Sequence, residues 1–295
     1  MRLADHCGLA LSELAESDPR IRVLDGDLAD SDGAVHFAER HPDRFLMSGI
    51  AEQSMVSVAA GMASCGLRPW VFSFAAFLCY RAYDQIRVSV SQARQPVTLV
   101  GSHSGGCSGR NGKTHAAVND IALMASLPGM QVWAPAGPRD VRLACREILD
   151  GNAPAYIRLP RRPLDDVDAD CFEPAKIALV SCGLGTHLAI ETRELLRDRG
   201  IETGVLHCAR VHPLPERIVD ALRGVETAFV IEDHSTFGGL ASLIQQRMPG
   251  LRVFAIGWPA DWPGQSGDDL DLLRLHGLSP DRIAGKIVNV LAERG

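Results

Sequence analysis

Residues 130–159 read MQVWAPAGPRDVRLACREILDGNAPAYIRL, and this stretch decides the expected fold. The apolar runs at 130–135 and 155–159 have the length and composition of buried strands. Between them, residues 138–149 follow a helical pattern, and Pro138 stands at the opening position, where its missing N–H costs little. Strand, helix and strand in this order predict a βαβ unit with parallel strands.

The same alternation continues on both sides of this stretch. Before it, we expect strands at 21–24, 70–73 and 96–101 and helices at about 3–16, 51–64, 80–93 and 117–127. After it, we expect strands at 177–182, 203–207, 227–231 and 252–256 and helices near 186–199, 215–223, 238–247 and 280–293. The pattern predicts an α/β fold of two doubly wound domains, each with a mainly parallel sheet covered on both faces.

A break in the pattern separates the two domains. From Pro160 to Pro174 the apolar period stops, and the run from Asp165 to Asp170 is acidic. We therefore predict a larger domain at 1–164, a linker at 165–174 and a smaller domain at 175–295. A length of 295 residues agrees with two domains.

Composition excludes several classes of protein. Hydrophobic residues make up 46% and charged residues 22%, as in packed globular chains. A net charge of -6 argues against nucleic acid or an anionic membrane as partner. No apolar run approaches the roughly 20 residues of a membrane span, and the charged first residues are unlike a secretory signal. We expect a cytoplasmic protein.

The eight cysteines carry no paired motif, since no two are closer than eleven positions. We expect them to be reduced and structural, because zinc and redox sites use closely spaced pairs. Cys107 stands apart because it lies in a glycine-rich loop.

Ligands bind at the carboxyl ends of parallel strands, so we expect the functional residues in the loops that follow the strands. The first such loop, residues 46–55, reads LMSGIAEQSM and places Glu52 in the first turn of a helix. This glutamate is either a surface carboxylate favoured by the helix dipole or a functional acid. The second, residues 72–80, reads FSFAAFLCY. On a helical turn Phe74, Phe77 and Tyr80 would share a face, as a core cluster or as a stacking wall for a planar ring.

The third loop, residues 101–115, reads GSHSGGCSGRNGKTH. Its two histidines and one arginine suit a polar, anionic or hydroxylated substrate. Its end resembles a nucleotide-binding P-loop, but Cys107 stands where that motif needs its first glycine. Similarly, Gly183-Leu184-Gly185 lacks the third glycine of a dinucleotide fingerprint and is expected to be a strand–helix turn.

Together these segments resemble the transketolase family of thiamine-diphosphate enzymes. The resemblance is carried by residues 49–61, 74–87, 103–115 and 120–122, and residues 231–240 are similar to part of the family's last domain. It covers nearly the whole chain. It implies a pyrimidine-binding domain at 1–164 and a transketolase C-terminal domain at 175–295.

The resemblance implies roles for individual residues. Glu52 would hydrogen-bond N1′ of the aminopyrimidine and favour the imino tautomer, which takes the proton from thiazolium C2 and makes the cofactor a carbon nucleophile. Phe74, Phe77 and Tyr80 would pack on the pyrimidine. On the sugar-phosphate side, the family's catalytic and substrate-binding positions correspond to His103, His115, Arg161, Arg2 and Ser31. His115 would contact the donor's hydroxyls, and the planar guanidinium of Arg161 suits phosphate.

One position departs from the family. The family's loop usually has Glu-Asp-Gly before the Thr-His pair, whereas this chain has Arg110-Asn111-Gly112. Asn111 replaces the aspartate that senses the acceptor's 2-hydroxyl, and Arg110 reverses a charge. We therefore expect an altered acceptor preference, in a specialised pathway rather than the central pentose-phosphate route.

The family's diphosphate and Mg²⁺ site, Gly-Asp-Gly followed by a spaced Asn, has no counterpart here, since Asp25-Gly26-Asp27-Leu28 lacks the final glycine. The resemblance therefore implies no metal ligands on this chain and a split transketolase of which this is the C-terminal subunit. Its N-terminal partner would supply the diphosphate and Mg²⁺ site, in a heterotetramer with two copies of each chain, and self-association is expected.

Three alternatives stay open. The chain could be the β subunit of a 2-oxo acid dehydrogenase or a relative of deoxyxylulose-phosphate synthase, because both share this fold pair and the glutamate. The two loop histidines and Arg161 favour a sugar phosphate over a lipoyl-linked acyl transfer. A non-catalytic scaffold subunit is the third, and Glu52 together with the aromatic residues argues against it.

Overall fold

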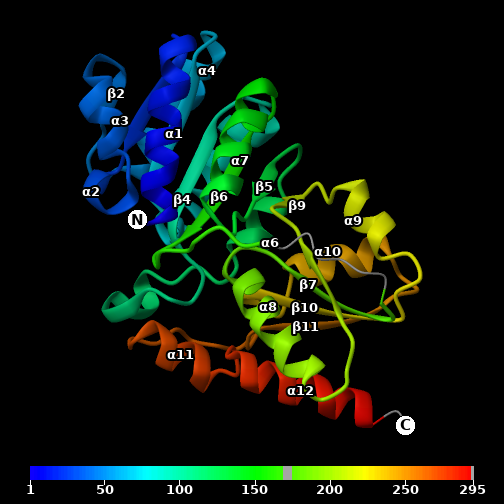
Figure 1. Ribbon diagram of the computed structural model, residues 1–295. Helices are drawn as coiled ribbons and strands as arrows, with labels where there is room; N and C mark the ends of the chain where they lie inside the picture. Colours follow the sequence, from blue (N-terminus) through cyan, green and yellow to red (C-terminus); the bar gives the residue numbers. More distant parts are fainter. Residues whose placement is uncertain (169–174, 294–295) are drawn as a thin grey trace.

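The computed structural model describes residues 1–168 and 175–293, and two sheets organise them (Figure 1). The larger sheet has the strand order β2-β1-β3-β4-β6-β5-β9. In that order the strands are Phe45–Met47, Ile21–Asp25, Arg68–Phe74, Thr98–Ser104, Ala155–Pro160, Gln131–Trp133 and Arg210–His212. Neighbouring strands are parallel except β9, which pairs antiparallel with β5.

Helices cover the larger sheet on both faces, because successive strand residues point to opposite sides and both sides are apolar. Val23, Phe72 and Ile157 pack in one cluster with residues of α1 and α7. Their chain neighbours Leu24, Val71 and Tyr156 pack in a second cluster with α4. The helices around this sheet are α1 (Leu3–Ser17), α2 (Ala29–Asp32), α3 (Val35–Arg40), α4 (Glu52–Ser64), α6 (Asp120–Ala125) and α7 (Pro138–Asp150).

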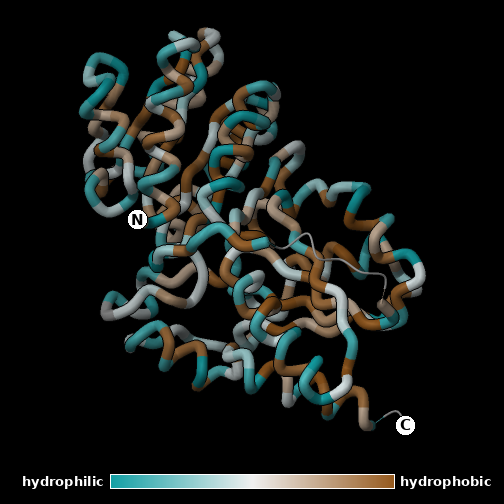
Figure 2. Tube along the Cα trace, in the orientation of Figure 1, coloured by the Kyte–Doolittle hydropathy of each residue, from teal (hydrophilic) through white to brown (hydrophobic). Residues whose placement is uncertain are grey.

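The smaller sheet is parallel throughout and has the order β11-β10-β7-β8. Its strands are Arg252–Trp258, Thr227–Ser235, Ile177–Ser181 and Gly204–His207. Its helices are α8 (Leu184–Arg197), α9 (Glu216–Ala221), α10 (Leu240–Arg247), α11 (Asp269–Leu275) and α12 (Pro280–Ala292). Figure 2 shows hydrophobic segments running through the sheets and hydrophilic ones gathering at loops and outer turns.

The predicted α/β class with two parallel-sheet units is confirmed. The sequence pattern missed short elements, among them β2, β9 and α11. Strand β9 lies within the range predicted for the smaller domain, yet it adds an edge strand to the larger sheet. The predicted linker lies partly outside the described residues, as does Cys171.

The segment expected to form a regular helix at 80–93 is wound more widely. It consists of two π-helical stretches, η2 (Phe77–Arg81) and η3 (Ile86–Gln92), joined by α5 (Tyr83–Gln85). In the first, Ala82 N–H donates to the Phe77 carbonyl at 3.3 Å, one residue beyond the α-helical partner. Such π turns are uncommon and are often found at functional sites.

Two further features concern the described part of the chain. No helix there is both long and apolar enough to cross a membrane. Its seven cysteines are free thiols, and all except Cys65 are buried. Cys107 is among the buried ones, which agrees with a structural role for its side chain.

Candidate active site

The site residues predicted from the sequence converge at the carboxyl edge of the larger sheet. Phe74 ends β3, His103 lies near the end of β4, and Arg161 follows β6 directly. Glu52 is the first residue of α4, just beyond β2. Parallel strands bring their carboxyl ends to one edge, so residues far apart in the chain meet there.

An aromatic cluster forms the centre of this site. The Phe74 and Phe77 rings are stacked with centroids 5.6 Å apart, and the Phe74 and His103 rings lie 4.0 Å apart. His115 meets the Phe77 ring edge-on at 5.1 Å. Two predicted aromatic residues and two predicted histidines are thereby brought together from β3, η2, β4 and the loop before α6.

Glu52 is enclosed beside this cluster. Its side chain is 1% exposed. Its Oε2 accepts a hydrogen bond from Arg81 Nη1 at 2.7 Å, and its Oε1 accepts a weaker one from Ser73 Oγ at 3.5 Å. A surface carboxylate held only by the helix dipole would face water, whereas this one is buried with a cationic partner.

Tyr80 does not share the predicted face. Phe74 is still in a strand, and the π turn that follows places Arg81, four residues after Phe77, over the Phe77 ring at 4.4 Å. Tyr80 is half exposed, and the ring contacts of the described residues do not include it. The expected helical turn through Phe74, Phe77 and Tyr80 is therefore wrong, and the role of Tyr80 against a pyrimidine stays a prediction.

His103 is buried in an electropositive setting. Its backbone adopts φ 53°, a left-handed conformation that few non-glycine residues take. Burial first, and then the nearby Arg161, Arg2 and His115 side chains, lower the pKa of His103 to about 4. At neutral pH the imidazole is therefore uncharged, surrounded by groups that attract an anion.

Arg161 lies across the glycine-rich loop. Gly109 has φ 58°, a conformation that favours glycine, and an added Cβ would stand 2.7 Å from Arg161 Nη1, so the guanidinium lies directly against this glycine. Asp269 at the start of α11 contacts both groups. One carboxylate oxygen lies 3.1 Å from Arg161 Nη1, and the other accepts from the Gly109 N–H at 3.0 Å. The sequence analysis missed Asp269, which is 108 residues away from Arg161.

Arg2 and Ser31 lie together. Arg2 Nη1 donates to the Ser31 carbonyl at 2.5 Å, and Nη2 donates to Asp5 Oδ1 at 2.6 Å. Nε donates to Asp5 as well, and Nη2 also reaches the Asp30 carbonyl. The guanidinium is thus held by residues of its own chain, and its positive charge contributes to the lowered pKa of His103.

The remaining loop residues are more open. Asn111 is exposed on the 3₁₀ turn η4 (Gly109–Thr114). His115 is half-buried, and its Nδ1 is 2.8 Å from Thr114 Oγ1. Of the two, His115 reaches the aromatic cluster and Asn111 lies at the rim.

The smaller unit contacts the larger one beside the site through buried polar groups. Arg158 Nε donates to Asp120 Oδ2 at 2.8 Å, and its Nη2 donates to the Asp233 carbonyl at 2.8 Å. Asp233 Oδ1 accepts from Trp258 Nε1 at 2.6 Å. Burial raises the pKa of Asp233 to about 6, with Arg158 acting in the opposite direction. These pairs could not be predicted from any local spacing of residues in the sequence.

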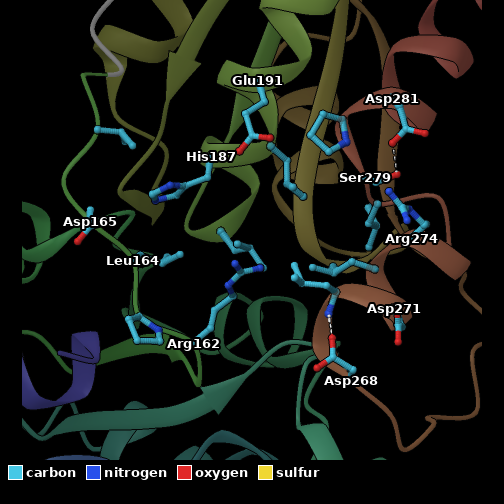
Figure 3. A pocket seen from close by; sticks show the side chains of 18 residues that line it. Arg162, Leu164, Asp165, His187, Glu191, Asp268, Asp271, Arg274, Ser279 and Asp281 are labelled. Carbon is cyan, nitrogen blue, oxygen red and sulfur yellow. Dashed lines mark hydrogen bonds between the residues drawn. The ribbon is translucent and has the colours of Figure 1, made fainter.

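A cavity of about 620 Å³ lies elsewhere, between the start of the linker, α8, α11 and the start of α12 (Figure 3). Arg162, His187, Glu191 and Arg274 are among its lining residues. None of the site residues predicted from the sequence lines it. Glu52 and the aromatic cluster therefore lie outside this cavity.

The residues at Glu52 fit a planar nitrogen ring. A carboxylate and an aromatic face are presented together, and the chain's own planar N–H donor, Arg81, already engages both. Within the described residues, no group of three or more His, Cys, Asp or Glu side chains is arranged to hold a metal ion.

Comparison with known protein families agrees with this geometry. Residues 1–166 match the transketolase pyrimidine-binding domain, and residues 172–283 match the transketolase C-terminal domain. The chain therefore belongs to the transketolase family.

Relatives show how much of a transketolase this chain spans. A protein of Methanocaldococcus jannaschii, named as a transketolase C-terminal section, is 31% identical over 95% of this chain and 93% of its own length. A 6-deoxy-6-sulfo-D-fructose transketolase subunit of Clostridium sp. is 35% identical over 79% of this chain and 76% of its own. A solved structure titled split gene transketolase, inactive beta4 tetramer, superposes with a TM-score of 0.88 at 29% identity, covering 99% of both chains.

Proposed function

We propose that this chain is the C-terminal subunit of a split transketolase that transfers a two-carbon ketol unit from a ketose phosphate to an aldose acceptor. The observation that carries the proposal is the buried Glu52 carboxylate beside Phe77, next to two histidines and Arg161. A carboxylate with an aromatic face suits an aminopyrimidine, and the adjoining cationic groups suit a phosphorylated sugar.

Thiamine diphosphate, when bound, supplies the carbon nucleophile that accepts the ketol unit. Glu52 would hold a proton at the ring nitrogen N1′, and its burial suits proton sharing because water does not compete for the carboxylate. Phe74 and Phe77 would fix the plane of the ring. Tyr80 is proposed as a further ring contact, and its exposure would then be lost in the complex.

The substrate would lie toward the glycine-rich loop. His103, uncharged at neutral pH, can donate or accept one hydrogen bond to a sugar oxygen without adding charge. His115 would reach the donor's hydroxyls. Arg161, assisted by Arg2 and Ser31, would receive the phosphate.

A partner subunit is part of the proposal. Large apolar side chains are exposed around α4 and the π-helical segment: Leu46, Met47, Ile50, Val58, Tyr80 and Val88. Their position next to Glu52 favours a protein interface at the site itself. The relative that covers the same extent of chain was solved as an inactive tetramer of one chain type. We propose that an N-terminal subunit supplies the diphosphate and Mg²⁺ site in an α2β2 complex, and that the isolated chain self-associates.

Acceptor choice would be set at the loop rim. Asn111 is exposed there and lacks the negative charge of the family's usual aspartate. A relative carries the name of a transketolase for a sulfonated sugar, so specialised substrates occur among similar chains. We propose a preference for an acceptor other than ribose 5-phosphate. A side-by-side panel of aldoses tests this, and ribose 5-phosphate as the best acceptor by a wide margin would contradict it.

The test of the proposed function is reconstitution with an N-terminal transketolase subunit from the same genome. The chain alone, the partner alone and the mixture are each given thiamine diphosphate, Mg²⁺ and one donor: xylulose 5-phosphate, fructose 6-phosphate or pyruvate. Ketol transfer from a ketose phosphate by the mixture alone is expected. Full activity of the single chain would exclude the split enzyme, and turnover of pyruvate would favour a synthase or dehydrogenase relative. Equal activity of the partner with and without this chain would make it a scaffold.

A further inference from the structure

Arg81 makes the two contacts that the proposed function assigns to an aminopyrimidine. Its Nη1 donates to Glu52 Oε2 at 2.7 Å, and its guanidinium carbon lies 4.4 Å from the centroid of the Phe77 ring. A guanidinium is planar, cationic and rich in N–H donors, so it can satisfy the same carboxylate and the same ring face as a protonated aminopyrimidine.

Arg81 reaches this place from the end of the π turn η2. It stands four positions after Phe77 and its guanidinium lies over the Phe77 ring, whereas the Tyr80 side chain is half exposed. The Arg81 side chain is 43% exposed, and the Glu52 side chain beneath it is 1% exposed. Arg81 therefore covers Glu52 from the solvent side and can leave by rotating its own side chain.

While Arg81 stays in this place, Glu52 Oε2 and the face of the Phe77 ring beneath the guanidinium are occupied. At 4.4 Å the guanidinium is already in stacking contact with the Phe77 ring. Among the described hydrogen bonds of the Glu52 side chain, the strong one comes from Arg81, and the bond from Ser73 is long. A buried carboxylate without a partner is unfavourable, so an occupant is needed whenever the ring is absent.

We propose that Arg81 is a reversible occupant of the aminopyrimidine position. It stabilises the Glu52 carboxylate in the chain without cofactor and must move out before the ring can bind, so it sets the apparent affinity for the cofactor. This inference rests on the proposed function. If the state with Arg81 withdrawn makes up about a tenth of the molecules, the apparent affinity is about tenfold weaker than that of the open site.

The experiment measures thiamine diphosphate binding to the reconstituted complex in the presence of Mg²⁺, by calorimetry and without substrate. Arg81→Gln is compared with Arg87→Gln, a matched control in which an arginine of nearly equal exposure (44%) pairs with Asp84 instead of Glu52. We expect Arg81→Gln to bind the cofactor about tenfold more tightly and Arg87→Gln to bind it as the wild type does. Unchanged or weaker binding by Arg81→Gln would overturn the inference.

Two further arms keep the result decisive. Arg81→Lys retains a cation for Glu52 but removes the planar group over Phe77, and it replaces Arg81→Gln if that variant does not fold. We again expect tighter cofactor binding than in the wild type. Equal or weaker binding would again contradict the inference. If the wild-type complex does not bind thiamine diphosphate at all, the proposed function fails. If it binds and the Arg81 variants do not gain affinity, this inference alone fails.

Discussion

Asp233 Oδ1 accepts a hydrogen bond from the Gly106 backbone N–H at 3.0 Å, joining β10 of the smaller sheet to the loop that carries His103 and His115. The loop backbone lies close to the side chains of Asp233 and Trp258. An added Cβ on Gly105 would stand 1.9 Å from Asp233 Oδ2, and one on Gly106 would stand 2.2 Å from Trp258 Cε2. The glycines of this loop therefore let Asp233 and Trp258 of the smaller unit pack directly against its backbone.

Asp233→Ala leaves two buried donors, Gly106 N–H and Trp258 Nε1–H, without their acceptor. We expect the free energy of unfolding, measured by urea denaturation, to fall by about 2–4 kcal/mol, since each unsatisfied buried group costs about 1–3 kcal/mol. Asp233→Asn keeps an acceptor oxygen and should lose less. Equal losses in the two variants would show that the acceptor geometry is unimportant.

The Arg158–Asp120 ion pair is buried, with side-chain exposures of 3% and 0%. Arg158→Met strands the Asp120 carboxylate, and we expect a loss of about 3–5 kcal/mol in urea denaturation, as for other broken buried pairs. Adding Asp120→Asn removes the stranded charge and should recover part of the loss. A double variant no more stable than Arg158→Met would contradict this assignment.

Glu232 gives a pH dependence with a definite sign. Burial raises its pKa from 4.5 to about 7, although the N–H groups of Ala241 and Leu240 oppose the shift. An acid with a raised pKa binds its proton more tightly in the folded state, so its contribution to stability is present below about pH 4.5 and is lost as the pH rises through about 7.

Between pH 5 and pH 8 we therefore expect wild type to lose up to about 3 kcal/mol relative to Glu232→Gln. Urea denaturation at several pH values measures the difference. Glu226→Gln, on the surface and with a lowered pKa, serves as control and should give no such relative loss. A wild-type minus Glu232→Gln difference that does not change with pH would refute the assignment.

Arg161→Gln tests the phosphate side of the site. We expect KM for a phosphorylated acceptor to rise at least about tenfold with little change for a short unphosphorylated aldehyde, because a charge-assisted contact with phosphate is lost. Arg40→Gln is the matched control, since Arg40 has the same 46% side-chain exposure and pairs with Glu16 on the surface. An equal rise in KM for both acceptors would mean that Arg161 does not read the phosphate.

The strands and most long helices of the core could be predicted because their apolar periods are strong, as at 130–159 and 227–231. Glu52, Phe74, Phe77, His103 and His115 could be brought together because strand ends share one edge. The turn at Tyr80 could not be predicted, since an α-helix and a π-helix present the same apolar residues over so short a segment. The contacts of Asp233 with Gly106 and of Asp269 with Arg161 could not be found because each joins residues more than a hundred positions apart.

The most direct test of the whole account is kcat for ketol transfer by the reconstituted complex carrying Glu52→Gln. The variant keeps the size of the side chain and removes the acid that would hold a proton at N1′. We predict a fall in kcat of at least about 100-fold, the scale of general acid–base effects, with Glu16→Gln on the surface unchanged. A Glu52→Gln complex that assembles and turns over within a few-fold of wild type would contradict the central claim.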